Sequence, residues 1–298
     1  MKRPLLYAPS LLLLGFLAVS LVVPVAADVT IRLYESKDSL ILRFKNLCNA
    51  HPGFAHYFSV GKSVQGRDIW AFGVGNASSP SILWDGQMHG SEDIGSELEY
   101  MMADWLLSSG QAKLKNNYYI FIPIVNIDTT NRQNMRRAYE TGRMDPFCLG
   151  VNLNRNFEHG WGWSGTSNRT DVEEYRGSYA ASEPETQAMI NVFKRYRPKQ
   201  YVNTHMWGGP WLGYWYAPRN PRLVNDTINK YKSICSYFGV EPYHEAECGM
   251  GGYAISDANY YSACAWLLEL NGEGTPPLYE VQTKYVYKVL PLLLAMSD

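Results

Sequence analysis

Two histidines and a glutamate stand at positions where they could bind one metal ion. His89 and Glu92 lie three residues apart in the string QMHGSE, and His205 ends the string KQYVNTH. A turn brings side chains three residues apart to the same side, so His89 and Glu92 could chelate the same ion. Two imidazoles and one carboxylate are a catalytic zinc set that leaves a fourth position for water. The pattern predicts a zinc site of His89, Glu92 and His205.

A fourth polar residue, Glu269, lies inside an apolar run. Its neighbours in the string WLLEL are Trp266, Leu267, Leu268 and Leu270, and a carboxylate is costly to desolvate there without a partner. A bound metal lowers the pKa of water and polarises a substrate carbonyl. Glu269 would then accept the proton of that water and pass it to a leaving amine, so we predict that it is the general base. Because H-x-x-E arises often by chance, the prediction depends on all four residues together.

An asparagine and an arginine follow each other in the string GVNLNRNF. If the protein acts at a chain end, something must hold the terminal carboxylate, and a planar guanidinium does so with paired hydrogen bonds. Arg155 supplies the guanidinium and Asn154 an amide donor. A second arginine near the metal would stabilise the oxyanion of a tetrahedral intermediate. The run NRQNMRR offers Arg136 for this role, with Arg137 and Arg132 as alternatives.

These residues fall at the ends of segments that have the character of buried strands. Continuous rather than alternating apolarity is typical of strands covered on both faces. The predicted strands are 68–75, 80–86, 118–126, 199–205 and 264–270. Ligands bind beyond the carboxyl ends of strands in such sheets, where His89, Glu92, His205 and Glu269 are placed.

Helical patterns alternate with the predicted strands. Residues 92–110 have apolar side chains at helical spacing, and 182–196 starts with Ser182, Pro184 and Glu185, which predicts a capping box. A last helix is predicted from about 279 to 295, bent or ended at Pro291. Strands that alternate with helices predict an α/β fold with a central sheet.

The ordered motifs resemble the zinc carboxypeptidases of the carboxypeptidase A type, the M14 metallopeptidases. The resemblance covers nearly all of the chain after its N-terminal segment, from VGKSVQGRDIWAFGVG through QMHGSE, GVNLNRNF, YRGSYAASEPET and YVNTH to LLELN. It implies a mixed, mostly parallel sheet of about eight strands flanked by helices. It also implies one zinc ion held by the two histidines and Glu92, with Glu269 as the base. Asn154 and Arg155 would bind the free carboxylate of a peptide substrate and Arg136 the oxyanion.

The chain departs from the family pattern near the site. Asn152 stands where the family usually has an Asp that orients the first zinc histidine, and an amide gives that ligand less basicity. Ungapped alignment places Glu247 in the slot of the family's mobile substrate-binding tyrosine, with Tyr243 and Tyr253 nearby. The preferred terminal side chain also stays open. If Asp257 faces the pocket, basic residues are favoured, and if it is structural, apolar ones are.

The N-terminal segment 1–27 has the pattern of a secretion signal. Lys2 and Arg3 precede an apolar run from Leu11 to Val23, and the small residues at 25–27 fit a cleavage site. The run is short for a membrane span. We expect a secreted protein with one catalytic domain at 28–298, and an uncleaved membrane anchor is the alternative.

Export gives the cysteines a possible structural role. The five cysteines allow at most two disulfides. Cys235 and Cys248 close a short loop, so we predict that they pair. Cys264 lies in the apolar run ACAWLLEL and is predicted to be a buried, inert thiol.

Charge excludes one class of partner, and two other functions stay open. The 298 residues carry a net charge of −1 without a long basic block, so no nucleic-acid or anionic-membrane partner is predicted. The leading hypothesis is a zinc exopeptidase that removes one C-terminal residue. One alternative is a zinc amidase that acts on a cell-wall peptide or another amide with a free carboxylate. The other is a non-catalytic surface binding protein of the same fold.

Overall fold

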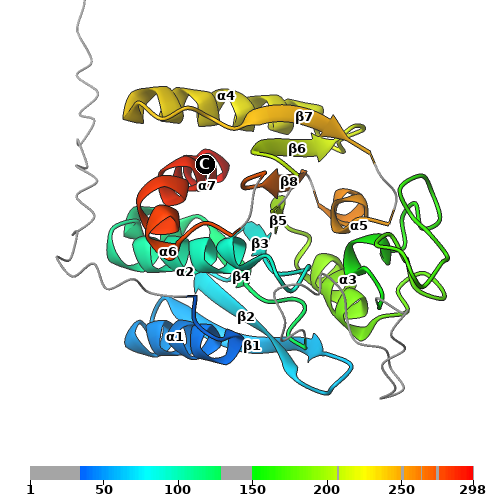
Figure 1. Ribbon diagram of the computed structural model, residues 1–298. Helices are drawn as coiled ribbons and strands as arrows, with labels where there is room; N and C mark the ends of the chain where they lie inside the picture. Colours follow the sequence, from blue (N-terminus) through cyan, green and yellow to red (C-terminus); the bar gives the residue numbers. More distant parts are fainter. Residues whose placement is uncertain are drawn as a thin grey trace, which may run out of the picture. The chain divides into compact units, whose positions relative to one another are not determined.

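A computed structural model describes residues 34–128, 150–206, 208–249, 252–262, 264–272 and 275–297. These residues belong to one compact unit built on an eight-stranded sheet, with the strand order β1-β2-β4-β3-β5-β8-β6-β7 (Figure 1). The strands are β1 (Ala55–Lys62), β2 (Asp68–Gly75), β3 (Ser81–Asp85), β4 (Tyr118–Ile122), β5 (Gln200–His205), β6 (Trp211–Trp215), β7 (His244–Cys248) and β8 (Ala265–Glu269).

The sheet is mixed, as the resemblance implied. The four central strands β4, β3, β5 and β8 run parallel to one another, and β6 pairs in parallel with β7. The other three pairings, β1–β2, β2–β4 and β6–β8, are antiparallel. Helices flank this sheet, so the predicted fold class is confirmed.

The buried strands are those that the apolar runs indicated. Every residue of β3, β4 and β5 is buried, whereas the edge strands β1 and β7 expose several side chains. The run 118–126 was predicted as one strand, but β4 ends at Ile122, immediately before Pro123. A proline lacks the N–H that a central strand needs for its ladder, which accounts for the early end.

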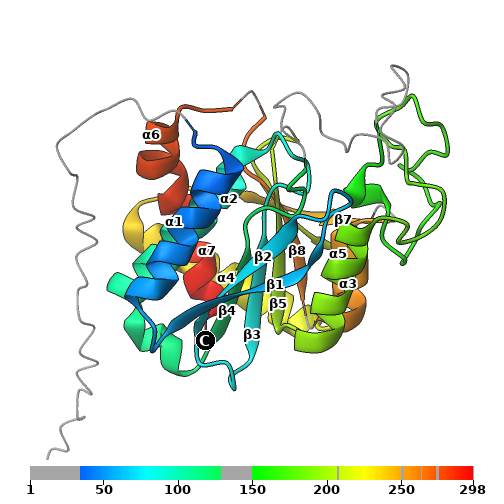
Figure 2. The ribbon, with the colours of Figure 1, turned by 90° about the horizontal axis from the view of Figure 1, so that it is seen from below.

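Helices cover both faces of the sheet. Helices α1, α2 and α7 lie on one side, with α4 packed on α7, and α3 and α5 lie on the other (Figure 2). The α-helices are α1 (Lys37–Ala50), α2 (Asp93–Ser108), α3 (Pro184–Tyr196), α4 (Pro221–Phe238), α5 (Ala254–Tyr261), α6 (Leu278–Glu280) and α7 (Val286–Met296). Short 3-10 turns are η1 (Gln111–Lys115) and η2 (Leu153–Arg155), and η3 (Val281–Tyr285) is a π-helical turn. No helix in the described part of the chain is both long and apolar enough to cross a bilayer.

The predicted capping box at the start of α3 is wrong. The N-cap residue is Glu183 rather than Ser182, and its side chain makes no capping bond within the described residues. The Ser182 hydroxyl instead donates to the Glu183 carboxylate (2.8 Å). Glu185 accepts a hydrogen bond from the Val64 main-chain N–H (3.1 Å). Ser182 therefore bonds to its neighbour in sequence and Glu185 to a distant loop instead of forming the box, while Pro184 occupies the first turn as predicted.

The last predicted helix is present but is divided. It starts as α6, passes through the π-helical turn η3 and continues as α7 to Met296. Pro291 lies inside α7 and does not end it. The interruption falls at the π turn instead.

The predicted Cys235–Cys248 disulfide is also wrong. The four described cysteines, Cys48, Cys235, Cys248 and Cys264, are free thiols. Cys248 lies 3.2 Å from the carbonyl oxygen of Tyr214, in hydrogen-bonding contact. Burial raises the pKa of the Cys264 thiol, as expected for a buried, inert side chain.

Candidate metal centre and active site

The carboxyl ends of three neighbouring parallel strands carry the site. His89 and Glu92 follow β3, His205 is the last residue of β5, and Glu269 is the last residue of β8. His205 and Glu269 are partners in the β5–β8 register. Gln87 has a positive φ of 46°, and Glu92 is the N-cap residue of α2, so the chain turns sharply between the strand and the helix. This turn directs His89 and Glu92 to the same point.

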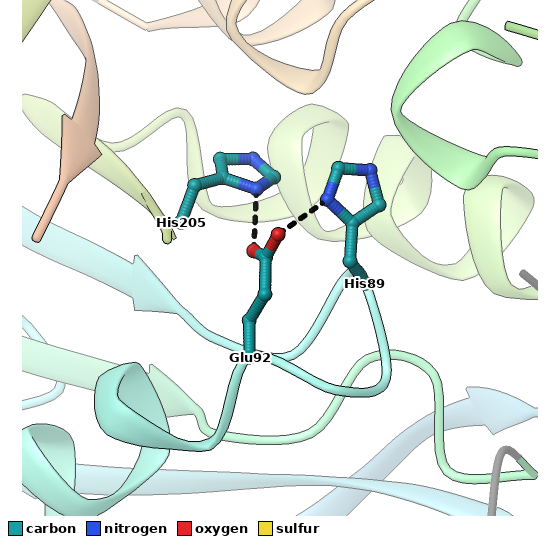
Figure 3. Close-up of side chains that lie close together, drawn as sticks. All are labelled: His89, Glu92 and His205. Atoms are coloured by element: carbon teal, nitrogen blue, oxygen red, sulfur yellow. Dashed lines mark hydrogen bonds and ion pairs between the residues drawn. The ribbon is translucent and has the colours of Figure 1, made fainter. Parts of the chain in front are cut away.

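His89, Glu92 and His205 converge on one point (Figure 3). The Nδ1 atom of His89 lies 2.9 Å from one carboxylate oxygen of Glu92, and the Nδ1 atom of His205 lies 2.9 Å from the other. One possible ligand atom from each residue lies within 4.8 Å of the others, and all three residues are buried. An ion about 2.0–2.2 Å from each ligand atom fits this arrangement with small side-chain adjustments. Two imidazoles and a carboxylate in this geometry are the triad typical of a zinc site.

The electrostatics give the ligands the ionisation states that a metal needs. Burial alone would raise the pKa of Glu92, but His89 and His205 outweigh it and lower that pKa to about 2. Burial lowers the pKa of His205, and Glu92 opposes this only in part. The result is a carboxylate beside a neutral imidazole, the forms in which these side chains bind metal.

Asn152 holds the ring of His89 in place of the Asp that the family pattern has there. The Nε2 atom of His89 lies 3.0 Å from Oδ1 of Asn152. The amide orientation is fixed, because Nδ2 donates to the carbonyl oxygen of Glu173 (3.0 Å) and Oδ1 accepts from the Asn154 main-chain N–H (3.0 Å). Only an oxygen therefore faces His89, so Nε2 donates and Nδ1 keeps its lone pair for a metal.

Glu269 lies near the triad, next to Gly208. The Gly208 main-chain N–H donates to Oε2 of Glu269 (3.1 Å). Burial, followed by the nearby charge of Glu92, raises the pKa of Glu269 to about 8, although Gly208 and Arg155 act in the opposite direction. A carboxylate with a pKa near neutrality can both accept and return a proton.

Asn154 and Arg155 lie beside the triad. Asn154 is buried, with Oδ1 accepting from the Ala254 main-chain N–H (2.8 Å) and Nδ2 lying 2.9 Å from Nε2 of His205. Arg155 donates from Nε to the carbonyl oxygen of Gly165 (2.8 Å) and from Nη1 to that of Asn154 (3.0 Å). Within the described part of the chain Nη2 makes no hydrogen bond, so it stays available to a carboxylate. Arg136 and its alternatives, Arg132 and Arg137, lie outside the described residues.

Tyr253 is a neighbour of Arg155 whose role the sequence left open. Its half-buried ring lies under the guanidinium, with 4.4 Å between Cζ of Arg155 and the ring centroid. Tyr243, the other tyrosine considered, is buried and donates to the carbonyl oxygen of Leu270 (3.4 Å). Glu247 is exposed on the edge strand β7. Of the three candidates, Tyr253 is the one in contact with Arg155.

Asp257 is held by the protein's own groups. It is fully buried and accepts from the main-chain N–H of His159 (2.6 Å) and from that of Glu158 (3.4 Å). The His159 ring contacts the same carboxylate through Nδ1 (2.9 Å), and this contact raises the pKa of His159. Asp257 is therefore a structural residue that ties α5 to the loop after η2.

Sequence reasoning missed two groups next to the site. Asn203 lies 2.6 Å from Nε2 of His205 through its Oδ1. Its position two residues before His205 on a strand was a usable signal, because such residues share a face. Gly208 contacts Glu269 from a loop, and no local pattern announces such a contact.

Comparison with known proteins first defines the class. The chain superimposes on the structure of bovine thrombin-activatable fibrinolysis inhibitor in complex with tick carboxypeptidase inhibitor with a TM-score of 0.73. The match covers 90% of this chain and 97% of that chain at 17% sequence identity, so it shows that the two share a fold. Together, fold and triad define a metal-site protein with the carboxypeptidase architecture.

The family follows from the sequence match. The zinc carboxypeptidase family matches residues 43–248, more than half of the chain, so this chain belongs to the zinc carboxypeptidase family. It is 28% identical over 228 residues to Carboxypeptidase A6 of Homo sapiens, covering 70% of this chain and 52% of that protein. It is also 31% identical over 173 residues to Inactive metallocarboxypeptidase ECM14 of Ajellomyces capsulatus, covering 51% of this chain and 29% of that protein. The chain thus spans about half or less of the length of these relatives.

Proposed function

We propose that this chain is a secreted zinc carboxypeptidase that hydrolyses the C-terminal peptide bond of peptides with a free carboxylate. The observation that carries the proposal is the pairing of His205 with Glu269 at the ends of β5 and β8. It places a half-buried carboxylate outside the ligand triad but close enough to Glu92 for the two charges to interact. Since a relative is named inactive, this carboxylate supports catalysis more directly than family membership does.

Each residue of the site has a role in this reaction. His89, Glu92 and His205 would hold zinc, which when bound supplies an activated water and a Lewis acid for the scissile carbonyl. Glu269 accepts the proton of the attacking water and delivers it to the nitrogen of the leaving amino acid. The Gly208 N–H holds the Glu269 carboxylate in place during both transfers.

Recognition of the chain end falls to Arg155 with Asn154. The free Nη2 side of the guanidinium suits a carboxylate, and the charge of Arg155 acts on both His205 and Glu269, which places it near the reacting groups. We assign the oxyanion to Arg136 on the sequence pattern alone.

The preferred terminal side chain is apolar rather than basic. A basic side chain would need Asp257 to face the pocket. The Asp257 carboxylate is instead fully buried against the main chain of 158–159. Ala254 and Ile255, the first residues of α5, are both buried and apolar. Ala254 donates to Asn154, so this apolar end of α5 lies next to the residues that would hold the carboxylate.

Secretion is supported by the sequence of residues 1–27. Their charged start, apolar run and small residues have the pattern of an export signal. N-terminal sequencing of the protein from the culture medium of its expression host tests this, and a start at or near Asp28 is expected.

The experiment that tests the activity is a matched set of peptides. Each peptide is prepared as the free acid and as the C-terminal amide, with Phe, Leu or Lys as the last residue, and is incubated with zinc-loaded protein. Mass spectrometry should show the loss of one residue from the free acids ending in Phe or Leu, with amides and Lys peptides cleaved far more slowly. Glu269→Gln is the control, since it should bind zinc but turn over roughly 10²–10⁴ times more slowly.

The outcomes separate the alternatives. Cleavage of amides as fast as free acids would refute the exopeptidase proposal. If zinc-loaded protein cleaves none of the peptides, the reaction is either on another amide or absent. Wild-type activity no higher than that of Glu269→Gln would favour a binding protein.

A further inference from the structure

Behind the triad, on the side away from Glu92, lies a row of buried polar side chains. Tyr201, Asn203 and His205 alternate along β5 and so share one face of the sheet. Asp85 ends the neighbouring strand β3 and is the register partner of Asn203. All four residues are almost inaccessible to solvent. Polar groups in such a place need partners, so their hydrogen bonds constrain one another.

The hydrogen bonds form a relay that starts at Asp85. Nδ2 of Asn203 donates to Oδ1 of Asp85 (2.7 Å), and the Tyr201 hydroxyl donates to Oδ2 (2.8 Å). The Thr204 main-chain N–H also donates to this carboxylate. With three donors converging on it, Asp85 turns the nitrogen of the Asn203 amide toward itself. The oxygen of that amide must then face His205, at 2.6 Å from Nε2.

The direction of the Asn203 amide decides which ring nitrogen of His205 carries the hydrogen. Nε2 lies between two groups with opposite demands, because Oδ1 of Asn203 needs a hydrogen and Nδ2 of Asn154, at 2.9 Å, needs a lone pair. A neutral imidazole has one protonated nitrogen, so both cannot be satisfied. Both amides have a fixed direction, Asn203 through Asp85 and Asn154 through the Ala254 N–H, so the shorter contact, that of Asn203, decides. Nε2 therefore donates to Asn203, and Nδ1 presents its lone pair on the side of Glu92.

We propose that Asp85 and Asn203 are positioning residues that hold His205 as the Nε2–H tautomer. This relay leaves Nδ1 for the metal and keeps the amide hydrogens of Asn154 for a substrate carboxylate. Only the second consequence, that the amide hydrogens of Asn154 are kept for a substrate carboxylate, rests on the proposed function. The two histidines then have matching supports. An amide oxygen accepts from Nε2 of each ring, that of Asn152 for His89 and that of Asn203 for His205. At Asn203 a buried carboxylate fixes the direction of that amide.

The first test measures zinc affinity without substrate, by competition with a chelator. Asp85→Asn keeps the shape but lets the Asn203 amide turn over, and Asn203→Leu removes the acceptor. Both should raise the zinc dissociation constant roughly 10–100-fold. Tyr201→Phe is the matched control, because it removes the other side-chain hydrogen bond to Asp85 and leaves the relay intact. The zinc dissociation constant of Tyr201→Phe should stay within about threefold of the wild-type value, well below the increase expected for the other two variants. Asp85→Asn and Asn203→Leu binding zinc as tightly as wild type would overturn the proposal.

The second test does not depend on the folding of any variant. In ¹⁵N-histidine-labelled, zinc-loaded wild-type protein, the two ring nitrogens of each histidine differ in chemical shift according to which is protonated. A directly bonded hydrogen on Nε2 of His205 is expected, whereas a metal bond or lone pair at Nε2 would refute the relay. Since neither test uses turnover, an inactive wild type would count against the proposed peptidase and leave this result standing.

Discussion

Gly208 lies against the carboxyl group of Glu269, at a point where an added side chain would displace that group. A Cβ atom added there would lie 2.6 Å from the carboxyl carbon of Glu269 and 2.7 Å from Oε1. The same residue donates its main-chain N–H to Oε2. At the scale of single residues, the position of the proposed base therefore depends on a glycine that carries no chemistry of its own.

We expect Gly208→Ala to reduce kcat by roughly 10²-fold or more, because a displacement of about 1 Å at a reacting group has that effect. Zinc affinity should stay within a factor of about three of the wild-type value. Losing a hydrogen-bond partner of a metal ligand would have a larger effect. Steady-state kinetics with a free-acid peptide and chelator competition measure the two quantities. Gly53→Ala is the control, since nothing lies within 4 Å of the added carbon. Full activity in Gly208→Ala would show that Glu269 tolerates displacement.

Tyr253 supports Arg155 through the face of its ring. A cation over an aromatic face gains about 0.5–2 kcal/mol, and the contact limits the positions of the guanidinium. Tyr253→Leu should therefore raise KM for free-acid peptides roughly 2–30-fold with a smaller change in kcat. Tyr253→Phe keeps the face and should behave like wild type. If Tyr253→Phe is as impaired as Tyr253→Leu, the hydroxyl rather than the ring face is responsible.

The residues of the triad could be predicted because local signals placed them. His89, Glu92 and His205 follow or end continuous apolar runs, and such runs form central strands whose carboxyl ends meet. The contacts of Gly208 and Tyr253 could not be predicted, because they join loops whose approach is set by tertiary packing. The direction of the Asn203 amide needed the register of β3 and β5.

At the scale of elements, the central strands were predictable and several peripheral elements were not. The edge strand β7 exposes part of its length and has no continuous apolar run, and the apolar run of its neighbour β6 is interrupted by Gly213. Helix α4 was missed although its signals are present. Asn220 accepts a hydrogen bond from the Leu223 main-chain N–H, Pro221 opens the helix, and Gly239 ends it with a left-handed φ of 66°.

The cap of α4 makes a prediction about stability. Asn220→Ala removes the acceptor of the Leu223 N–H (3.1 Å) and should lower the free energy of unfolding by about 0.5–2 kcal/mol. Activity should not change. Asn225→Ala, at an exposed position within the same helix, should be neutral or slightly stabilising, since alanine has the higher helix propensity. Urea denaturation compares the two, and equal effects would mean that the Asn220 side chain does not act as a cap.

At the scale of the whole molecule, the sheet keeps several carboxyl groups away from water. Glu92 and Glu269 belong to the site, whereas Asp85 is buried at the end of β3 and Glu99 is buried in α2, which packs on β3. Burial raises the pKa of Asp85 to about 7 against the effect of its hydrogen-bond donors. Neither carboxyl oxygen of Glu99 has a hydrogen-bond partner among the described residues. Burial, followed by the nearby charge of Asp85, raises the pKa of Glu99 well above its ordinary value.

The raised pKa of Glu99 ties stability to pH in a definite direction. Between its ordinary pKa of 4.5 and the raised value, the folded protein holds a proton that the unfolded chain releases. Stability from this group is complete below pH 4.5 and is lost as the pH rises toward the folded pKa. Glutamine has no such proton to release, so Glu99→Gln should gain stability relative to wild type as the pH rises from 5 to 8. Each kcal/mol gained in the free energy of unfolding should raise Tm by roughly 2–4 °C.

Thermal unfolding of zinc-saturated protein at pH 5, 6, 7 and 8 measures this difference. Comparing variant with wild type at each pH cancels the pH dependence of zinc binding, which both proteins share. Glu241→Gln, on the exposed surface, should leave the slope of Tm against pH unchanged. If Glu99→Gln follows the wild-type slope as well, Glu99 holds no extra proton in the folded state. The loss of stability with pH would then have to come from the other described carboxyl groups whose pKa is raised by burial, Asp85, Glu97 and Glu269.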